Sequence, residues 1–194
     1  TATGNITYTV VLNDNVSYLN SNTKAFTANN GTVTSVTGSG KNYTVIVTPD
    51  NNKEGNVELS INTSGGAKDT SLNDIDVLAD TLTGVSNNKY VQAFDTKGPS
   101  VESITVPSST VQSTTNITIT LSEAITTSQF TKADMTVSSG TIGTLVPQNV
   151  SNGKASQYIV PYTPSTNPAI DGNVTLTVAS GGYQDDVGNS GTSS

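Results

Sequence analysis

The chain contains an internal duplication, and no other feature of the sequence limits its fold so strongly. The segment "YTVIVTP" (43–49) returns as "YIVPYTP" (158–164), and "EGNVELSINTSGGAKD" (54–69) returns as "DGNVTLTVASGGYQD" (171–185). Two shorter pairs match in the same order: "TYTVVLND" (7–14) with "NITITLSE" (116–123), and "NGTVTSV" (30–36) with "SGTIGTL" (139–145). The duplication predicts two copies of one folded module.

Within the repeated segments, apolar residues alternate with threonine and serine. A period of two is typical of antiparallel strands that cover a core with one face, and no segment has a convincing helical pattern. Threonine and valine favour strands, and clusters of Gly, Asn and Pro separate the runs. The positions predicted to face the core are Tyr8, Val10, Leu12, Tyr43, Val45, Val47, Val57, Leu59 and Ile61 in the first copy, and Ile117, Ile119, Leu121, Tyr158, Val160, Tyr162, Val174, Leu176 and Val178 in the second.

Each copy spans about 100 residues with some seven short strands, which predicts an immunoglobulin-like antiparallel β-sandwich. The predicted fold class is therefore all-β, with two sandwiches in tandem. The boundary falls at "DTKGP" (95–99), so residues 1–97 form the first module and residues 98–194 the second. Only the second copy has a strand at about 100–106, and only the first has one at about 88–94. We therefore expect the first module to lack its first strand and the second its last, which leaves sheet edges for neighbouring modules to cover.

Composition excludes several classes of function. The net charge of −7 and the lack of a Lys/Arg cluster argue against nucleic-acid binding. No apolar run reaches the roughly 18 residues that insertion into a membrane requires. The chain has no Cys and no His, so it offers no disulfide, thiol nucleophile, histidine base or zinc site of these ligands.

Two features that could suggest catalysis do not support it. The segment "GSGK" (38–41) lacks the spacing of a phosphate loop, and Asn42 stands where that motif needs Ser or Thr, so we predict a hairpin turn. Paired carboxylates could serve a glycosidase, but here they fall in loops at one end of a sandwich, without an aromatic platform for a sugar. We expect no enzyme activity.

The repeats resemble the bacterial Ig-like modules of large surface proteins, such as biofilm-associated adhesins and S-layer proteins. The motifs that carry this resemblance are "LSEAI" (121–125), "FTKADMTVSSGTIGTL" (130–145), "YIVPYTP" (158–164), "GNVTLTVASGGYQDDVGN" (172–189) and the linker "DTKGP". It covers all of the second copy and most of the first, which reads "LNDNV" and "KDTSLND" at two of these places. The resemblance implies an extracellular location on the bacterial cell surface, a spacer role, and neighbouring modules of the same protein as partners.

The loops at one pole of the second sandwich, together with the linker, bring four carboxylates and an amide oxygen to the junction between the modules. The residues are Asp95 of the linker, Glu123, Asp185, Asp186 and Asn189. Calcium takes about six to eight oxygens from carboxylates, carbonyls and water, so we predict a calcium site there. The resemblance implies the same, because calcium stiffens the junctions of several relatives. The alternative is that these are solvated loop acids with ordinary Asp/Gly/Asn turn chemistry.

The corresponding residues of the first module predict a second, weaker calcium site. They are Asp14, Asp69, Asn73 and Asp74, with Asp76 and Asp80 on an acidic insertion that runs from Ile75 to about Ser86. Two functions follow from the sequence. The leading hypothesis is a structural spacer or lattice element of a repetitive surface protein. The alternative is a binding module whose loops hold a glycan, a host protein or a cell-surface protein.

Overall fold

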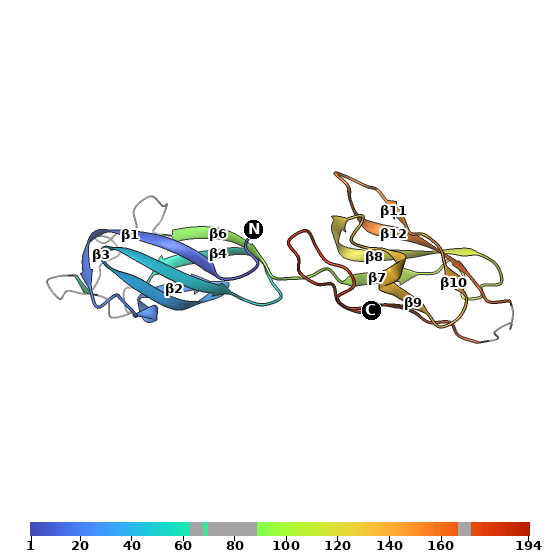
Figure 1. Ribbon diagram of the computed structural model, residues 1–194, viewed down its shortest axis with the longest axis horizontal. Coiled ribbons are helices and arrows are strands. Elements are labelled where there is room, and N and C mark those ends of the chain that lie inside the picture. Colours follow the sequence, from blue (N-terminus) through green and yellow to red (C-terminus); the bar gives the residue numbers. More distant parts are fainter. Residues whose placement is uncertain (63–67, 70–88, 167–171) are drawn as a thin grey trace. The chain divides into compact units, whose positions relative to one another are not determined.

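The computed structural model describes residues 1–62, 68–69, 89–166 and 172–194 (Figure 1). The chain divides into two compact units, Thr1–Lys97 (unit 1) and Gly98–Ser194 (unit 2), and each unit has its own hydrophobic core. The described residues contain no α-helix, only the short 3-10 turns η1 (Thr23–Ala25) and η2 (Lys132–Asp134). The all-β class predicted from the sequence is confirmed.

Unit 1 consists of two three-stranded antiparallel sheets. The first sheet has the order β3-β1-β5, from β3 (Gly31–Pro49), β1 (Ile6–Ser17) and β5 (Lys68–Asp69). The second has the order β2-β4-β6, from β2 (Phe26–Asn29), β4 (Glu54–Ile61) and β6 (Lys89–Asp95). Both sheets contribute apolar residues to one core, as a sandwich requires.

Unit 2 has a large sheet and a small one. The large sheet has the order β10-β12-β8-β7, and β11 also pairs with β12. The small sheet pairs β13 with β9. The bounds are β7 (Val101–Thr105), β8 (Thr115–Thr126), β9 (Met135–Val137), β10 (Thr141–Ile142), β11 (Val146–Gln148), β12 (Lys154–Thr163) and β13 (Leu176–Val178). Three aromatic rings strengthen this core, because Phe130 packs edge-on against both Tyr158 and Tyr183, with ring centroids 4.9 and 5.2 Å apart.

The duplication extends to the pairing of the strands. Residues that correspond in the sequence repeats occupy corresponding positions in the sheets. The pairs Tyr8–Val45, Val10–Tyr43, Phe26–Ile61 and Ala28–Leu59 of unit 1 match Ile117–Val160, Ile119–Tyr158, Met135–Val178 and Val137–Leu176 of unit 2. Each unit therefore repeats the register of the other, as well as its sequence.

The predicted core positions are buried, with two exceptions in the last repeated segment. Leu176 is half buried and packs at the margin of the core. Val174 was predicted to face inward, and this was wrong, because its side chain is 39% exposed. The ladder between β13 and β9 begins only at Leu176, so the alternation of buried and exposed positions does not extend back to Val174.

A bulge interrupts the same strand in both units. The pairing of β8 with β12 breaks between Thr120 and Ile125, and that of β1 with β3 breaks between Val11 and Val16. The residues that leave the ladder belong to the motifs "LSEAI" and "LNDNV". These two motifs therefore form a bulge at the same position in each unit.

Candidate functional site

The acidic loop, residues 183–191 of unit 2, closes on itself through its backbone. The amide of Asp185 donates to the carbonyl of Asn189 (3.1 Å), and the amide of Gly191 donates to the carbonyl of Tyr183 (2.8 Å). Gly188 lies in the left-handed region (φ 94°), where glycine is free of strain. At the base of the loop the buried ring of Tyr183 anchors it in the core, and its hydroxyl donates to the carbonyl of Thr192 (2.7 Å).

Asp185 turns back into its own loop and is only 3% exposed. Its Oδ1 accepts hydrogen bonds from the amides of Val187 (2.9 Å) and Asn189 (2.8 Å), and its Oδ2 accepts one from Asn189 Nδ2 (2.8 Å). Three N–H donors stabilise a buried carboxylate without a cation. This is the Asp/Gly/Asn turn chemistry that the sequence left open as the alternative.

Asp186 points the other way, toward the large sheet. Its Oδ1 accepts a hydrogen bond from Thr126 Oγ1 (2.7 Å), and its Oδ2 forms an ion pair with Lys154. Thr126 and Lys154 are register partners at the ends of β8 and β12. The hydrogen bond from Lys154, and next the one from Thr126, lower the pKa of Asp186 below its ordinary value. The adjacent carboxylates are therefore stabilised by two separate sets of donors.

The predicted junction residues divide between the two units. Asp95 ends β6 in unit 1, where its Oδ1 accepts a hydrogen bond from the amide of Lys97 (3.0 Å). Within unit 2 the structure brings Asp185 and Asn189 together, while Glu123 lies half-buried in the bulge of β8. Among the described residues, no three acidic side chains gather in a group that could hold a metal. Calcium would have to compete for these carboxylates with the amides that donate to Asp185 and with the ammonium group that pairs with Asp186.

The weaker site predicted in unit 1 falls largely outside the described residues. Asp14 lies in β1 and Asp69 lies in β5. These two strands pair with each other, and Asp69 is the register partner of Val16. Asn73 and Asp74, like Asp76 and Asp80, lie outside the described residues. The calcium site of unit 1 stays a prediction, and so does the one at the junction.

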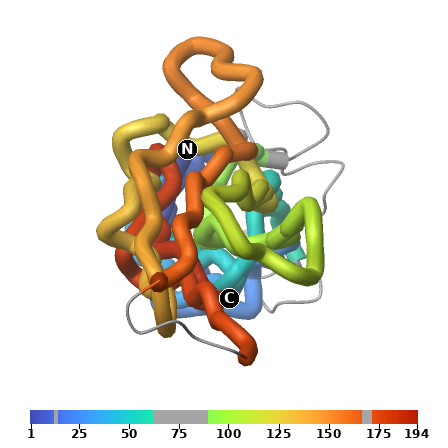
Figure 2. The backbone as a smooth tube through the Cα atoms, turned by 90° about the vertical axis from the view of Figure 1, so that its right-hand side faces the viewer, coloured from blue at the N-terminus to red at the C-terminus, as the bar shows by residue number. Residues whose placement is uncertain are grey.

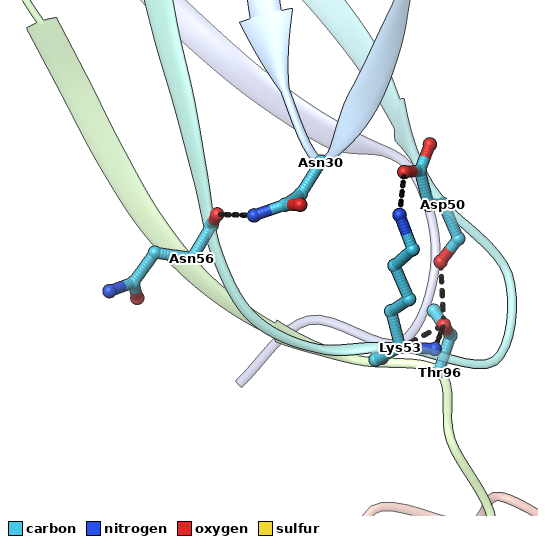
Figure 3. Close-up of polar contacts among 5 residues, drawn as sticks. All are labelled: Asn30, Asp50, Lys53, Asn56 and Thr96. Atoms are coloured by element: carbon cyan, nitrogen blue, oxygen red, sulfur yellow. Dashed lines mark hydrogen bonds and ion pairs between the residues drawn. The ribbon is translucent and has the colours of Figure 1, made fainter.

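A second polar cluster fixes the first part of the linker to unit 1 (Figure 3). The hydroxyl of Thr96 donates to the carbonyl of Asp50 (2.7 Å) and accepts a hydrogen bond from the amide of Lys53 (3.1 Å). The amide of Thr96 also donates to the carbonyl of Lys53 (2.8 Å), and an ion pair of 2.7 Å joins Lys53 Nζ to Asp50 Oδ2. In the neighbouring turn, Asn30 Nδ2 donates to the carbonyl of Asn56 (3.0 Å). These contacts with Asp50 and Lys53 attach Thr96 to unit 1.

The end of the linker is built into unit 2. A Cβ atom on Gly98 would lie 2.0 Å from the carbonyl oxygen of Ser190, so only glycine fits at this close approach. Pro99 is buried, and its carbonyl accepts a hydrogen bond from the amide of Thr192 (3.0 Å). The sequence indicated a short connector here, but it gave no sign of the contacts that hold each end, because their partners are distant in the chain.

The family model of the bacterial Ig-like domain matches residues 95–194. The chain belongs to this family. The match covers all of unit 2 and the linker residues from Asp95, and it confirms the resemblance seen in the motifs. Bacterial Ig-like domains commonly occur in surface proteins as structural modules, and they are typically not enzymes. Comparison with curated proteins and with solved structures found no match. Among the described residues, no helix is long and apolar enough to cross a membrane.

Proposed function

We propose that the chain is a pair of spacer modules from a repetitive bacterial cell-surface protein, an adhesin or an S-layer protein. The observation that carries this proposal is the way the linker is held. Thr96 is bound to unit 1, and Gly98 and Pro99 are packed into unit 2. Lys97 lies between them, and its amide donates to Asp95 Oδ1.

A spacer must transmit position and force from one module to the next, and a short anchored linker suits that task. Each residue adds two soft backbone dihedrals, so the freedom between modules grows with the number of residues that neither module holds. A flexible linker of Gly and Ser behaves as a random coil, whose ends move further apart as it lengthens. Anchoring both ends of the connector removes most of that freedom without any large interface.

Lengthening the linker tests the spacer proposal. Four residues, Gly-Ser-Gly-Ser, are inserted between Lys97 and Gly98, and the alignment of each unit in a dilute liquid-crystal medium is measured by NMR residual dipolar couplings. In the natural chain both units should align as one body, and in the insertion variant they should align independently. The control carries the same insertion between Ser109 and Thr110, in the loop between β7 and β8. Independent alignment in the natural chain would contradict the proposal.

Calcium at the junction is the finer part of the sequence hypothesis, and it stays a proposal. It is supported by the family resemblance and by the number of carboxylates on either side of the linker. Against it stand the hydrogen bonds and the ion pair that already occupy Asp185 and Asp186. The spacer proposal does not depend on the ion, because the contacts that anchor the linker are made by protein groups alone.

A further inference from the structure

We propose that unit 2 binds a neutral carbohydrate in an open cavity on the outer side of its large sheet. The cavity measures about 450 Å³, within the range of roughly 300–1,000 Å³ that small-molecule sites occupy. Thr120 of β8, Gln157 of β12 and Gln148 of β11 line it, and these three residues lie side by side across the sheet. Their neighbours Ile119 and Tyr158 are fully buried, so this row faces away from the core.

The bulge of β8 and the loop between β11 and β12 form the cavity together. The pairing of β8 with β12 is interrupted between Thr120 and Ile125. Ala124 lies in this interruption and lines the cavity. The loop between β11 and β12 bounds the other side and projects from the body of unit 2 (Figure 2). In this loop Asn149 (φ 51°) and Asn152 (φ 50°) are both left-handed. Asn152 and Gly153 form the turn of a hairpin that the amides of Ser151 and Lys154 close by donating to each other's carbonyls. Bulges are over-represented next to active sites.

The lining selects against charged ligands. It offers amides and hydroxyls, from Asn149, Asn152, Gln157 and Thr120, which both donate and accept hydrogen bonds. Gln148 adds its amide oxygen as an acceptor, because its Nε2 already donates to the carbonyls of Val146 (3.0 Å) and Pro147 (3.3 Å). Among the described residues that line the cavity there is no carboxylate to attract a cation. Lys154 also lines the cavity, and it is paired with Asp186. An anion would therefore meet an ammonium group whose charge Asp186 already balances.

The pairing of β12 also selects against a peptide in strand conformation. At Gln157 this strand is paired on both sides, with Thr120 and with Gln148, so β12 itself offers no edge for strand addition in the middle of the cavity. A ligand rich in hydroxyl groups matches the amides and hydroxyls of the lining, because a hydroxyl can both donate a hydrogen bond to them and accept one from them. The cavity is open, and its described lining contains no aromatic side chain, so we expect weak binding, with a Kd on the order of 1–10 mM for one sugar. Repeated modules on a polysaccharide would add avidity.

Titration of the whole ¹⁵N-labelled chain with D-glucose, D-galactose, D-mannose and N-acetyl-D-glucosamine tests this proposal. At least one sugar should give saturable amide shifts in residues 148–157 and at Thr120. The double variant Asn149→Gly, Asn152→Gly should weaken binding at least about tenfold, which is about 1.4 kcal/mol. Glycine accepts the left-handed backbone at both positions, so the loop should keep its shape. The matched control is Asn52→Gly, which makes the same change at a left-handed asparagine of unit 1 (φ 56°) and should leave binding unchanged.

Three results would overturn the carbohydrate assignment. One is the absence of saturable shifts with all four sugars up to about 100 mM, well above the expected Kd. Another is unchanged binding in the double variant. The third is stronger binding of sodium glucuronate or of a blocked tetra-alanine peptide, which would assign the cavity to an anion or to a peptide. The amide spectrum of each variant separates lost binding from lost folding, and none of these results bears on the alignment test of the spacer.

Discussion

At the scale of single residues, the acidic loop shows how neighbouring carboxylates coexist. Asp185 is buried and accepts three hydrogen bonds from N–H groups of its own loop. Asp186 is about one-third exposed and bonds to Thr126 and Lys154 on the large sheet. The first aspartate therefore fixes the shape of the loop, and the second attaches the loop to the strand ends. The two should differ in their contribution to stability.

Replacing each aspartate by alanine separates these roles. Asp185→Ala leaves partly buried N–H groups without their acceptor, so it should lower the free energy of unfolding by about 1–3 kcal/mol. Asp186→Ala removes a partly exposed ion pair and should cost no more than about 1 kcal/mol. Urea unfolding of the whole chain, followed through the amide signals of unit 2, measures both values. Equal losses would show that the hydrogen bonds of Asp185 do not stabilise the loop.

The pH dependence of Asp186 has a definite sign. Its pKa is lowered in the folded chain, so its contribution to stability is present above the unfolded value of about 3.9 and is lost as the pH falls through the folded pKa. The stability difference between the natural chain and Asp186→Asn should therefore be constant from pH 7 to about pH 5, and should shrink in stronger acid. In a Lys154→Met background this dependence should be reduced. Urea titrations across this pH range measure it, and a difference that grows toward acid would contradict the ion pair.

At the scale of elements, the sequence predicted what depends on local alternation. The repeated strands and nearly all their inward residues followed from a period of two, because each residue's face is fixed by its neighbours in the ladder. The error at Val174 lies where the ladder stops. The partners of Asp186 could not be found in this way, since nothing in the sequence near Lys154 or Thr126 indicates that the acidic loop packs against them. The sequence predicted that the acidic residues lie in loops at one end of the module. The direction in which each carboxylate points depends on tertiary contacts, which the sequence does not show.

Two valines in the last repeated segment test how far this alternation extends. Val178 is fully buried in β13, whereas Val174 lies before the strand and is 39% exposed. Val178→Ala should lower the free energy of unfolding by about 1.5–3 kcal/mol, and Val174→Ala by less than about 0.5 kcal/mol. Thermal unfolding by calorimetry compares the same substitution at both sites. A similar loss at Val174 would restore the inward position predicted from the sequence.

At the scale of the whole chain, two units with separate cores are joined by a linker that is bound at both ends. Unit 1 holds Thr96 and unit 2 holds Gly98 and Pro99, so the coupling proposed here comes from the backbone and needs no ion. The sequence hypothesis assigned the same coupling to calcium. The two explanations give opposite expectations for chelation, and the stability of unit 2 distinguishes them.

If the protein contacts alone couple the units, removal of calcium should leave the melting of unit 2 unchanged, because hydrogen bonds and Lys154 already stabilise Asp185 and Asp186. An ion bound only to the folded chain would add about 2.7 kcal/mol at roughly 100 times its Kd. In a module of about 100 residues that gain would raise the melting temperature by roughly ten degrees or more. Calorimetry of the whole chain in 10 mM CaCl₂ and in EDTA makes the comparison, with the double variant Asp185→Asn, Asp186→Asn as the control. A rise in calcium that the double variant abolishes would establish the junction site after all, and would mean that the ion displaces Lys154 from Asp186.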